Sequence, residues 1–137
     1  MTKEEKELLL KDLCARLPYS TLCYCKWTKD APNGTSGCVQ EVSTYLLEEL
    51  MIIGDQNYKC QICEIKPYLR PMSSMTEEDD ARRSAFLDDI EGGVEDAIPN
   101  YIDWLNEHHF DYRSLIPIGL ALEAPEDMYD MTKKISY

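Results

Sequence analysis

The periodicity of the chain changes at residues 19–27, YSTLCYCKW. Every second residue of this stretch, from Tyr19 through Cys23 to Trp27, falls on the same face of an extended chain. The stretch is also rich in aromatic side chains, which strands favour over helices. We therefore expect a β-strand here, and the segments on either side are interpreted outward from it.

The segment before this strand has the pattern of a helix over residues 1–17. Thr2 and Glu5 have the spacing of a capping box, in which each side chain satisfies a backbone donor of the first turn. Leucines recur every four residues and form one apolar stripe: Leu9, Leu13 and Leu17. Asp12 and Arg16 are also four apart, and we expect them as an ion pair on the exposed side. Pro18 ends the helix.

The segment after the first strand continues as sheet. Residues 28–37 contain Pro-Asn-Gly, which is typical of a tight reversal, and residues 38–43 then predict a returning strand. Residues 45–53 allow either a short helix or a strand. Residues 58–66 read as one further strand, which two prolines close. We expect three or four antiparallel strands between residues 19 and 66.

The second half returns to helical periodicity. Thr76 and Asp79 offer another capping box, and Gly92-Gly93 ends the helix that they begin. Pro99 can open the next helix, and Asp111 can cap a short fourth helix that ends near residue 119. The tail from residue 125 is polar, and we expect it to be loosely held.

Together these patterns predict a single α+β domain over residues 1–137. Its parts are an N-terminal helix, a small antiparallel β-meander with the option of a partial barrel, C-terminal helices and a loose tail: 1–17, 19–66, 76–118 and 125–137. No apolar run reaches the roughly 20 residues that span a bilayer, and the N-terminus lacks the pattern of a secretory signal. We therefore expect a cytoplasmic protein with no membrane contact.

Charge is distributed unevenly along the chain. The net charge is −12, and residues 72–137 hold sixteen Asp/Glu against five Lys/Arg. An acidic surface repels phosphate, so we expect no direct nucleic-acid binding. The same surface suits a basic protein partner or a divalent cation, although a solvated helical face would have the same composition. The pattern leaves the oligomeric state open.

The spacing of the cysteines and histidines indicates neither a metal site nor a catalytic motif. Cys60 and Cys63, three apart in an expected strand, would point to opposite faces, and no glycine between them permits a zinc knuckle. Adjacent His108 and His109 diverge by about 100° on a helix, so they seldom share one ion. No phosphate loop or nucleophile motif occurs. We therefore expect reduced, metal-free thiols, no cofactor and no catalytic residue.

Candidate binding residues lie at the expected ends of elements, where a scaffold usually presents them. Tyr and Arg carry much of the energy of interfaces, and the candidates include both types: Tyr68, Arg70, His108, His109, Asp111, Tyr112, Arg113 and Trp27. The alternative is that each Arg pairs with a local carboxylate such as Asp111 and each Tyr ring lies in the core.

Four segments, taken together, carry a family resemblance: residues 11–19, 65–78, 104–113 and 119–125. They resemble a family of small uncharacterised proteins from phages, prophages and mobile elements of Bacteroides-type gut bacteria. The resemblance is weak over residues 20–57 and implies a setting rather than an activity. It favours a non-enzymatic accessory protein in a bacterial host cell, which binds a protein partner and can thereby counteract a host defence. Alternatives are sequestration of a small nucleotide signal and a small metal-dependent enzyme.

Overall fold

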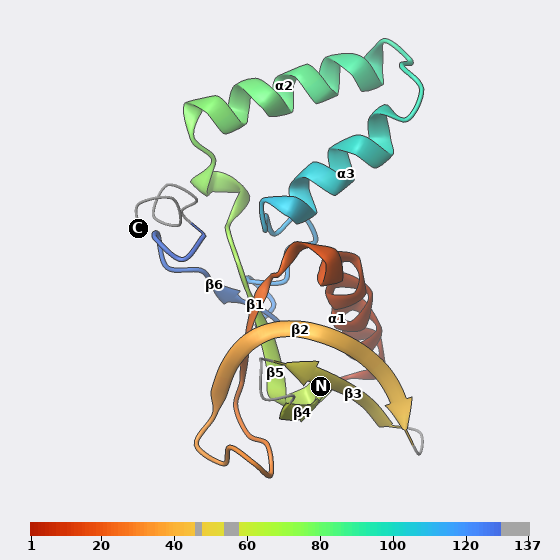
Figure 1. The fold of residues 1–137 in the computed structure, drawn as a ribbon. Coiled ribbons are helices and arrows are strands. Elements are labelled where there is room, and N and C mark those ends of the chain that lie inside the picture. The colour runs from red at the N-terminus through yellow and green to blue at the C-terminus, as the bar shows by residue number, and fades with distance from the viewer. Residues whose placement is uncertain (46–47, 54–57, 130–137) are drawn as a thin grey trace.

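The computed structural model describes residues 1–45, 48–53 and 58–129. It confirms the α+β class: an N-terminal helix, a mixed sheet and a pair of C-terminal helices (Figure 1). The helices are α1 (Lys3–Arg16), α2 (Glu77–Glu91) and α3 (Ala97–Glu107). The strands are β1 (Leu22–Cys25), β2 (Thr35–Tyr45), β3 (Glu48–Ile53), β4 (Tyr58–Gln61), β5 (Ile65–Leu69) and β6 (Leu122–Glu123).

The sheet has the order β4-β3-β2-β1-β5-β6. Strands β1 to β4 form the expected antiparallel meander, and the ambiguous segment is strand over Tyr45 and 48–53, with 46–47 outside the described residues. Strand β5 pairs with the other side of β1, and β6 joins it in parallel. The parallel pairing of β6 was not predicted, because a two-residue strand has no periodicity.

The expected strand over residues 58–66 is wrong in one respect. A 3₁₀ turn at Ile62–Glu64 divides it into β4 and β5, which stand four places apart in the sheet. Four strand spacings in a flat sheet are about 19 Å, whereas the link from Gln61 to Ile65 reaches about 14 Å. The sheet must therefore curl, and the Thr28 hydroxyl beyond β1 donates to the Lys59 carbonyl on β4 at 2.6 Å.

The main core lies between α1 and the curled sheet. Its fully buried side chains come from both layers and from the segment after α3: Leu9, Leu13, Cys23, Cys25, Cys60, Ile65, Leu69 and Leu115. The leucine stripe and the capping box of Thr2 and Glu5 are as predicted. The sequence therefore located this helix and the two leucines of its buried face, Leu9 and Leu13.

Helices α2 and α3 form a hairpin that projects away from the sheet (Figure 1). Thr76 and Asp79 form the predicted capping box, and Gly93 takes a φ of 72° after the last turn of α2. Phe86, Tyr101 and Trp104 stack between the two helices, with centroids of the first two rings 5.7 Å apart. Within the described ranges, no helix is long and apolar enough to cross a membrane.

The expected fourth helix after Asp111 does not form. Residues 111–119 make a series of turns, in which Ser114 and Gly119 have positive φ. The Asp111 carboxylate does bond backbone amides, as a cap would, but the chain then turns back toward the sheet to supply β6. Tertiary packing of the following apolar residues overrides the local helix signal here.

Candidate functional site

Two charged residues of α1 lie inside the molecule. Asp12 is 0% exposed and Arg16 is 1% exposed, and the Arg16 Nε donates to Asp12 Oδ2 at 2.9 Å. The Arg16 Nη2 donates to the Phe110 carbonyl at 2.7 Å. Arg16 thus connects the first helix to the segment after α3. The sequence predicted this pair on the exposed side, and that prediction is wrong.

A second guanidinium shares the same carboxylate. Arg113 Nη1 donates to Asp12 Oδ1 at 2.8 Å. The ring of Tyr112 lies near both guanidiniums, with its centroid 5.3 Å from Arg16 Cζ and 4.6 Å from Arg113 Cζ. Cations near an aromatic face are stabilised by the ring quadrupole. The cluster carries two positive charges against one negative charge, and these contacts partly offset the cost of its burial.

Arg70, at the end of β5, connects the sheet to the helical hairpin. Its Nη2 lies 3.2 Å from Asp79 Oδ2 in the first turn of α2, and its Cζ lies 4.2 Å from the Phe110 ring centroid. Burial opposes ionisation of Asp79, but hydrogen bonds from Thr76 and the Arg70 guanidinium outweigh it and lower the pKa of that carboxyl. Arg70 therefore fixes the base of the hairpin.

The segment after α3 is held to β5 through its backbone. The Arg70 amide donates to the His109 carbonyl, and the Asp111 amide donates to the Arg70 carbonyl, each at 2.8 Å. The buried Asp111 carboxylate accepts from the amides of Leu115 and Ile116 at 2.8 and 2.9 Å. Asp111 therefore shapes a turn and pairs with neither of the two arginines.

His109 and Tyr129 form a second buried contact between distant segments. His109 has a φ of 64°, its Nδ1 lies 2.8 Å from the Thr21 hydroxyl, and its ring stacks on Tyr129 with 3.8 Å between centroids. The Tyr129 hydroxyl accepts from the Leu22 amide and donates to the Tyr68 carbonyl. Burial raises the pKa of Tyr129. The expected loose tail is therefore fastened at this residue, and residues 130–137 lie outside the described residues.

Seven of the eight predicted candidates come together at the junction between sheet and hairpin: Tyr68, Arg70, His108, His109, Asp111, Tyr112 and Arg113. Trp27 does not join them, because it lies beyond the opposite end of β1 and is 52% exposed. Both arginines of the group pair with carboxylates, as in the alternative interpretation, although the partners are Asp79 and Asp12. These residues hold the junction together, and a binding role for them stays a prediction.

The sequence interpretation missed three residues of this junction: Asp12, Arg16 and Tyr129. A signal existed for two of them. Residues 9, 12, 13 and 16 follow the spacing of a buried helical stripe, and two of those positions are charged. Their residue types suggested exposure, while their positions indicated burial.

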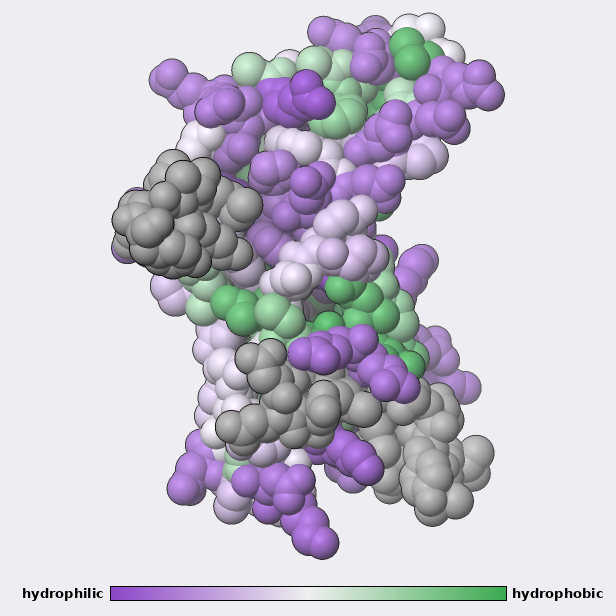
Figure 2. Space-filling model, viewed as in Figure 1, coloured by the Kyte–Doolittle hydropathy of each residue, from purple (hydrophilic) through white to green (hydrophobic). Residues whose placement is uncertain are grey.

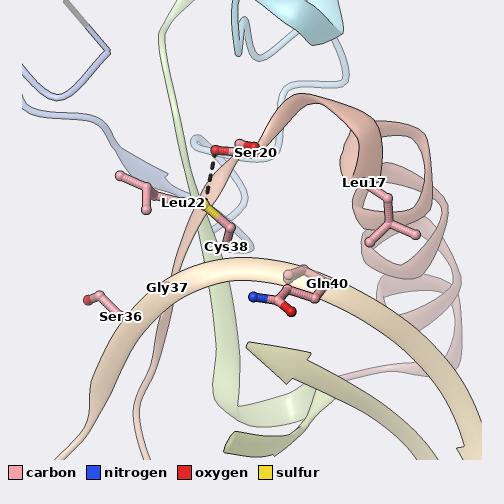
Figure 3. Close-up of a pocket in the computed structure, with 8 residues that line it drawn as sticks. Leu17, Ser20, Leu22, Ser36, Gly37, Cys38 and Gln40 are labelled. Carbon is pink, nitrogen blue, oxygen red and sulfur yellow. Dashed lines mark hydrogen bonds between the residues drawn. The ribbon is translucent and has the colours of Figure 1, made fainter. Parts of the chain in front are cut away.

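A neutral pocket of about 580 Å³ opens between the end of α1 and the strands β1 and β2 (Figure 3). Eight residues line it: Leu17, Ser20, Leu22, Ser36, Gly37, Cys38, Val39 and Gln40. The Cys38 thiol donates to the Ser20 carbonyl at 3.3 Å across one side. None of these described residues is charged, so the lining presents no cation to the phosphate of a nucleotide signal.

The thiols occupy different environments. Cys23, Cys25 and Cys60 are buried, whereas Cys14 and Cys63 are exposed. Burial raises the pKa of Cys23 and of Cys60. Among the residues that the structure describes, no three His, Cys, Asp or Glu side chains gather where they could hold a metal ion.

No protein-family model, no curated protein and no solved structure matches this chain.

Proposed function

We propose that this chain is a non-enzymatic accessory binding protein and that its α2–α3 hairpin docks a basic protein partner. The observation that carries the proposal is where the charge lies. Residues 76–107 contain eleven Asp/Glu and two Arg, so nine of the twelve net negative charges belong to this one hairpin. The rest of the chain is close to balanced.

The arrangement of the hairpin directs this charge outward. No residue of α2 is buried, and the hairpin projects from the body (Figure 1). Both of its arginines lie against its aromatic residues: Arg83 Nε donates to the Tyr101 hydroxyl at 2.9 Å, and Arg82 Cζ lies 5.2 Å from the Phe86 ring centroid. The acidic side chains therefore dominate the outer surface.

Such a surface favours one class of macromolecule over others. A negative patch attracts a positively charged protein and accelerates its encounter, while it repels phosphate-bearing polymers. The hairpin is also fixed at its base by the contact of Arg70 with Asp79, so it presents a preformed rather than a folding surface. A preformed charged arm is the form expected of a docking element.

The biological setting of the proposal rests on the sequence resemblance alone. In that setting the chain is an accessory product of a phage or mobile element, and binding a host protein counteracts a defence in the bacterial cell. The basic partner would be a component of that defence, for example a protein that itself binds nucleic acid.

The experiment compares two variants that each lose four negative charges. The hairpin variant neutralises four exposed residues near the α2–α3 turn: Asp88→Asn, Asp89→Asn, Glu91→Gln and Glu95→Gln. The control variant neutralises four exposed residues elsewhere: Glu7→Gln, Glu41→Gln, Glu123→Gln and Glu126→Gln. Both should keep the wild-type melting temperature, because exposed charges contribute little to stability.

Each protein is used as bait in a lysate of the bacterial host, with and without infection, and captured proteins are identified by mass spectrometry. We expect a basic protein to be captured by the wild type and the control and lost by the hairpin variant. Capture should also weaken between low and physiological salt, because the screening length falls to about 8 Å. Equal capture by the two variants would contradict the proposal.

A further inference from the structure

Three large apolar side chains stand exposed at the turn end of the hairpin. Leu87 is 42% exposed, Val94 is 53% exposed and Ile98 is 60% exposed. We refer to these three residues as the apolar tip. Among the residues whose exposure the structure describes, three other large apolar residues are exposed to a similar degree, and all lie outside the hairpin: Met1, Trp27 and Ile118. Figure 2 shows hydrophobic residues at this end of the hairpin among hydrophilic ones.

Helix geometry places two members of the apolar tip, Leu87 and Ile98, on one side. Leu87 follows Phe86, whose ring stacks on Tyr101 of α3, and Ile98 follows Ala97, which is buried at the start of α3. A step of one residue rotates a side chain by about 100°. Because α2 and α3 run in opposite directions (Figure 1), this rotation carries Leu87 and Ile98 to the same side of the hairpin.

Acidic residues flank the members of the apolar tip along the sequence, both at the end of α2 and in the turn before α3. Five of them are exposed there: Asp88, Asp89, Glu91, Glu95 and Asp96. Exposed apolar groups rimmed by polar residues are typical of protein contacts. A second copy of this chain would bring an identical acidic rim against the first, and like charges oppose that approach. Charge complementarity therefore selects an occupant that combines apolar residues with flanking cations.

We propose that the apolar tip anchors a basic amphipathic helix of the partner protein, with its apolar stripe on the apolar tip and its Lys or Arg side chains over the acidic rim. This inference rests on the proposed function and names the recognised segment. A helix with apolar residues at positions i, i+3 and i+4 presents them as one apolar stripe. The acidic rim then determines the on-rate and the salt dependence, and the apolar tip determines the specificity.

The probes are two synthetic peptides of lysine and leucine with the same composition. One places its leucines along a single helical face, and the other has them in scrambled order, so both carry the same charge. Binding of each fluorescently labelled peptide is measured by anisotropy at physiological salt. We expect the amphipathic peptide to bind the wild type about tenfold more tightly than the scrambled one, because only it can bury the apolar tip.

The variants distinguish the contribution of the apolar contact to peptide binding from the contribution of charge. Leu87→Gln with Ile98→Gln should abolish the preference for the amphipathic peptide while scrambled-peptide binding is kept. The matched control is Ile118→Gln, which removes an isoleucine that is 51% exposed outside the hairpin and should keep the preference. Val94→Gln, in the turn between the helices, repeats the test without altering a helix. Melting curves confirm that each variant is folded.

Each outcome has a distinct meaning. A preference that survives in the apolar-tip variant, or no preference in the wild type, overturns this inference but leaves the acidic docking arm intact. If the variant with four hairpin charges removed binds both peptides as the wild type does, the proposed function fails as well. A wild-type dimer in light scattering that Leu87→Gln with Ile98→Gln converts to monomer would assign the apolar tip to a second copy and overturn the inference.

Discussion

Asp12→Ala removes the single carboxylate that two guanidinium groups share. In the wild type, Asp12 accepts from Arg16 Nε at 2.9 Å and from Arg113 Nη1 at 2.8 Å. After the substitution, Arg16 keeps its bond to the Phe110 carbonyl but has no counter-charge. Arg113 is partly exposed and can turn toward water, whereas Arg16 at 1% exposure cannot. The loss therefore falls mainly on Arg16.

The magnitude follows from this difference in burial. Breaking a buried ion pair by removing one partner costs about 3–5 kcal/mol, because a charge is left uncompensated. The Arg113 contact adds about 0.5 kcal/mol, as is usual for a pair that reaches solvent. The higher helix propensity of alanine offsets about 0.5 kcal/mol of this loss of stability. We therefore expect Asp12→Ala to lower the free energy of unfolding by about 4 kcal/mol, a large part of the 5–15 kcal/mol of an ordinary domain.

Urea unfolding followed by circular dichroism measures this loss as a lower midpoint with an unchanged slope. The matched control is Glu7→Ala, because Glu7 and Lys11 have the same spacing on the exposed side of the same helix. That control should lose only about 0.3 kcal/mol. A double-mutant cycle of Asp12→Ala with Arg16→Met should give a coupling of about 2 kcal/mol. A loss of less than about 1 kcal/mol for Asp12→Ala, or a loss equal to that of the control, would contradict the assigned role of the buried ion pair.

Three further substitutions or treatments test other contacts of the junction and core. Asp79→Asn should lower the free energy of unfolding at neutral pH. Because the folded pKa of Asp79 lies below its ordinary value, the difference from wild type should begin to shrink as pH falls through about 3.9 and should vanish only below the lower folded pKa; a constant difference across pH would contradict this. Tyr129→Phe should cost about 1–2 kcal/mol in urea unfolding, since two backbone groups lose the hydroxyl, and an unchanged midpoint would show that the tail is not held. Iodoacetamide at pH 8 should label the exposed thiols of Cys14 and Cys63 well before the buried thiols of Cys23 and Cys60. Mass spectrometry can follow the labelling, and equal rates at the exposed and the buried thiols would contradict the assigned burial.

The candidate site shows where residue type misleads sequence interpretation. Arg70 and Arg113 have the residue type that interfaces favour, yet both donate to carboxylates at the junction. Their partners, Asp79 and Asp12, are 9 and 101 residues away in sequence. No local pattern identifies a partner at the longer separation. The acidity of the hairpin, by contrast, was visible in the sequence, because net charge is a sum that needs no fold.

The features that could be predicted from the order of residues rest on local interactions. Helix caps, the leucine stripe and the change from a period of 3.6 to a period of 2 depend on residues within a few positions of one another. They predicted the α+β class, the N-terminal caps of α1 and α2, and an antiparallel meander of three or four strands, in which the segment of β3 stayed open between helix and strand. Such signals act within one element, so they survive in any tertiary context.

Other features require distant segments to meet, and they depend on the tertiary fold. The turn at Ile62–Glu64 exists because the curled sheet brings β4 near β1. The residues after Asp111 form turns instead of a helix, because the chain returns to the sheet as β6. Asp12 and Arg16 are buried because Phe110 and Arg113 return to cover α1. A buried charge is tolerated only with its partners in place, and those partners are supplied by the fold rather than by neighbouring residues in the sequence.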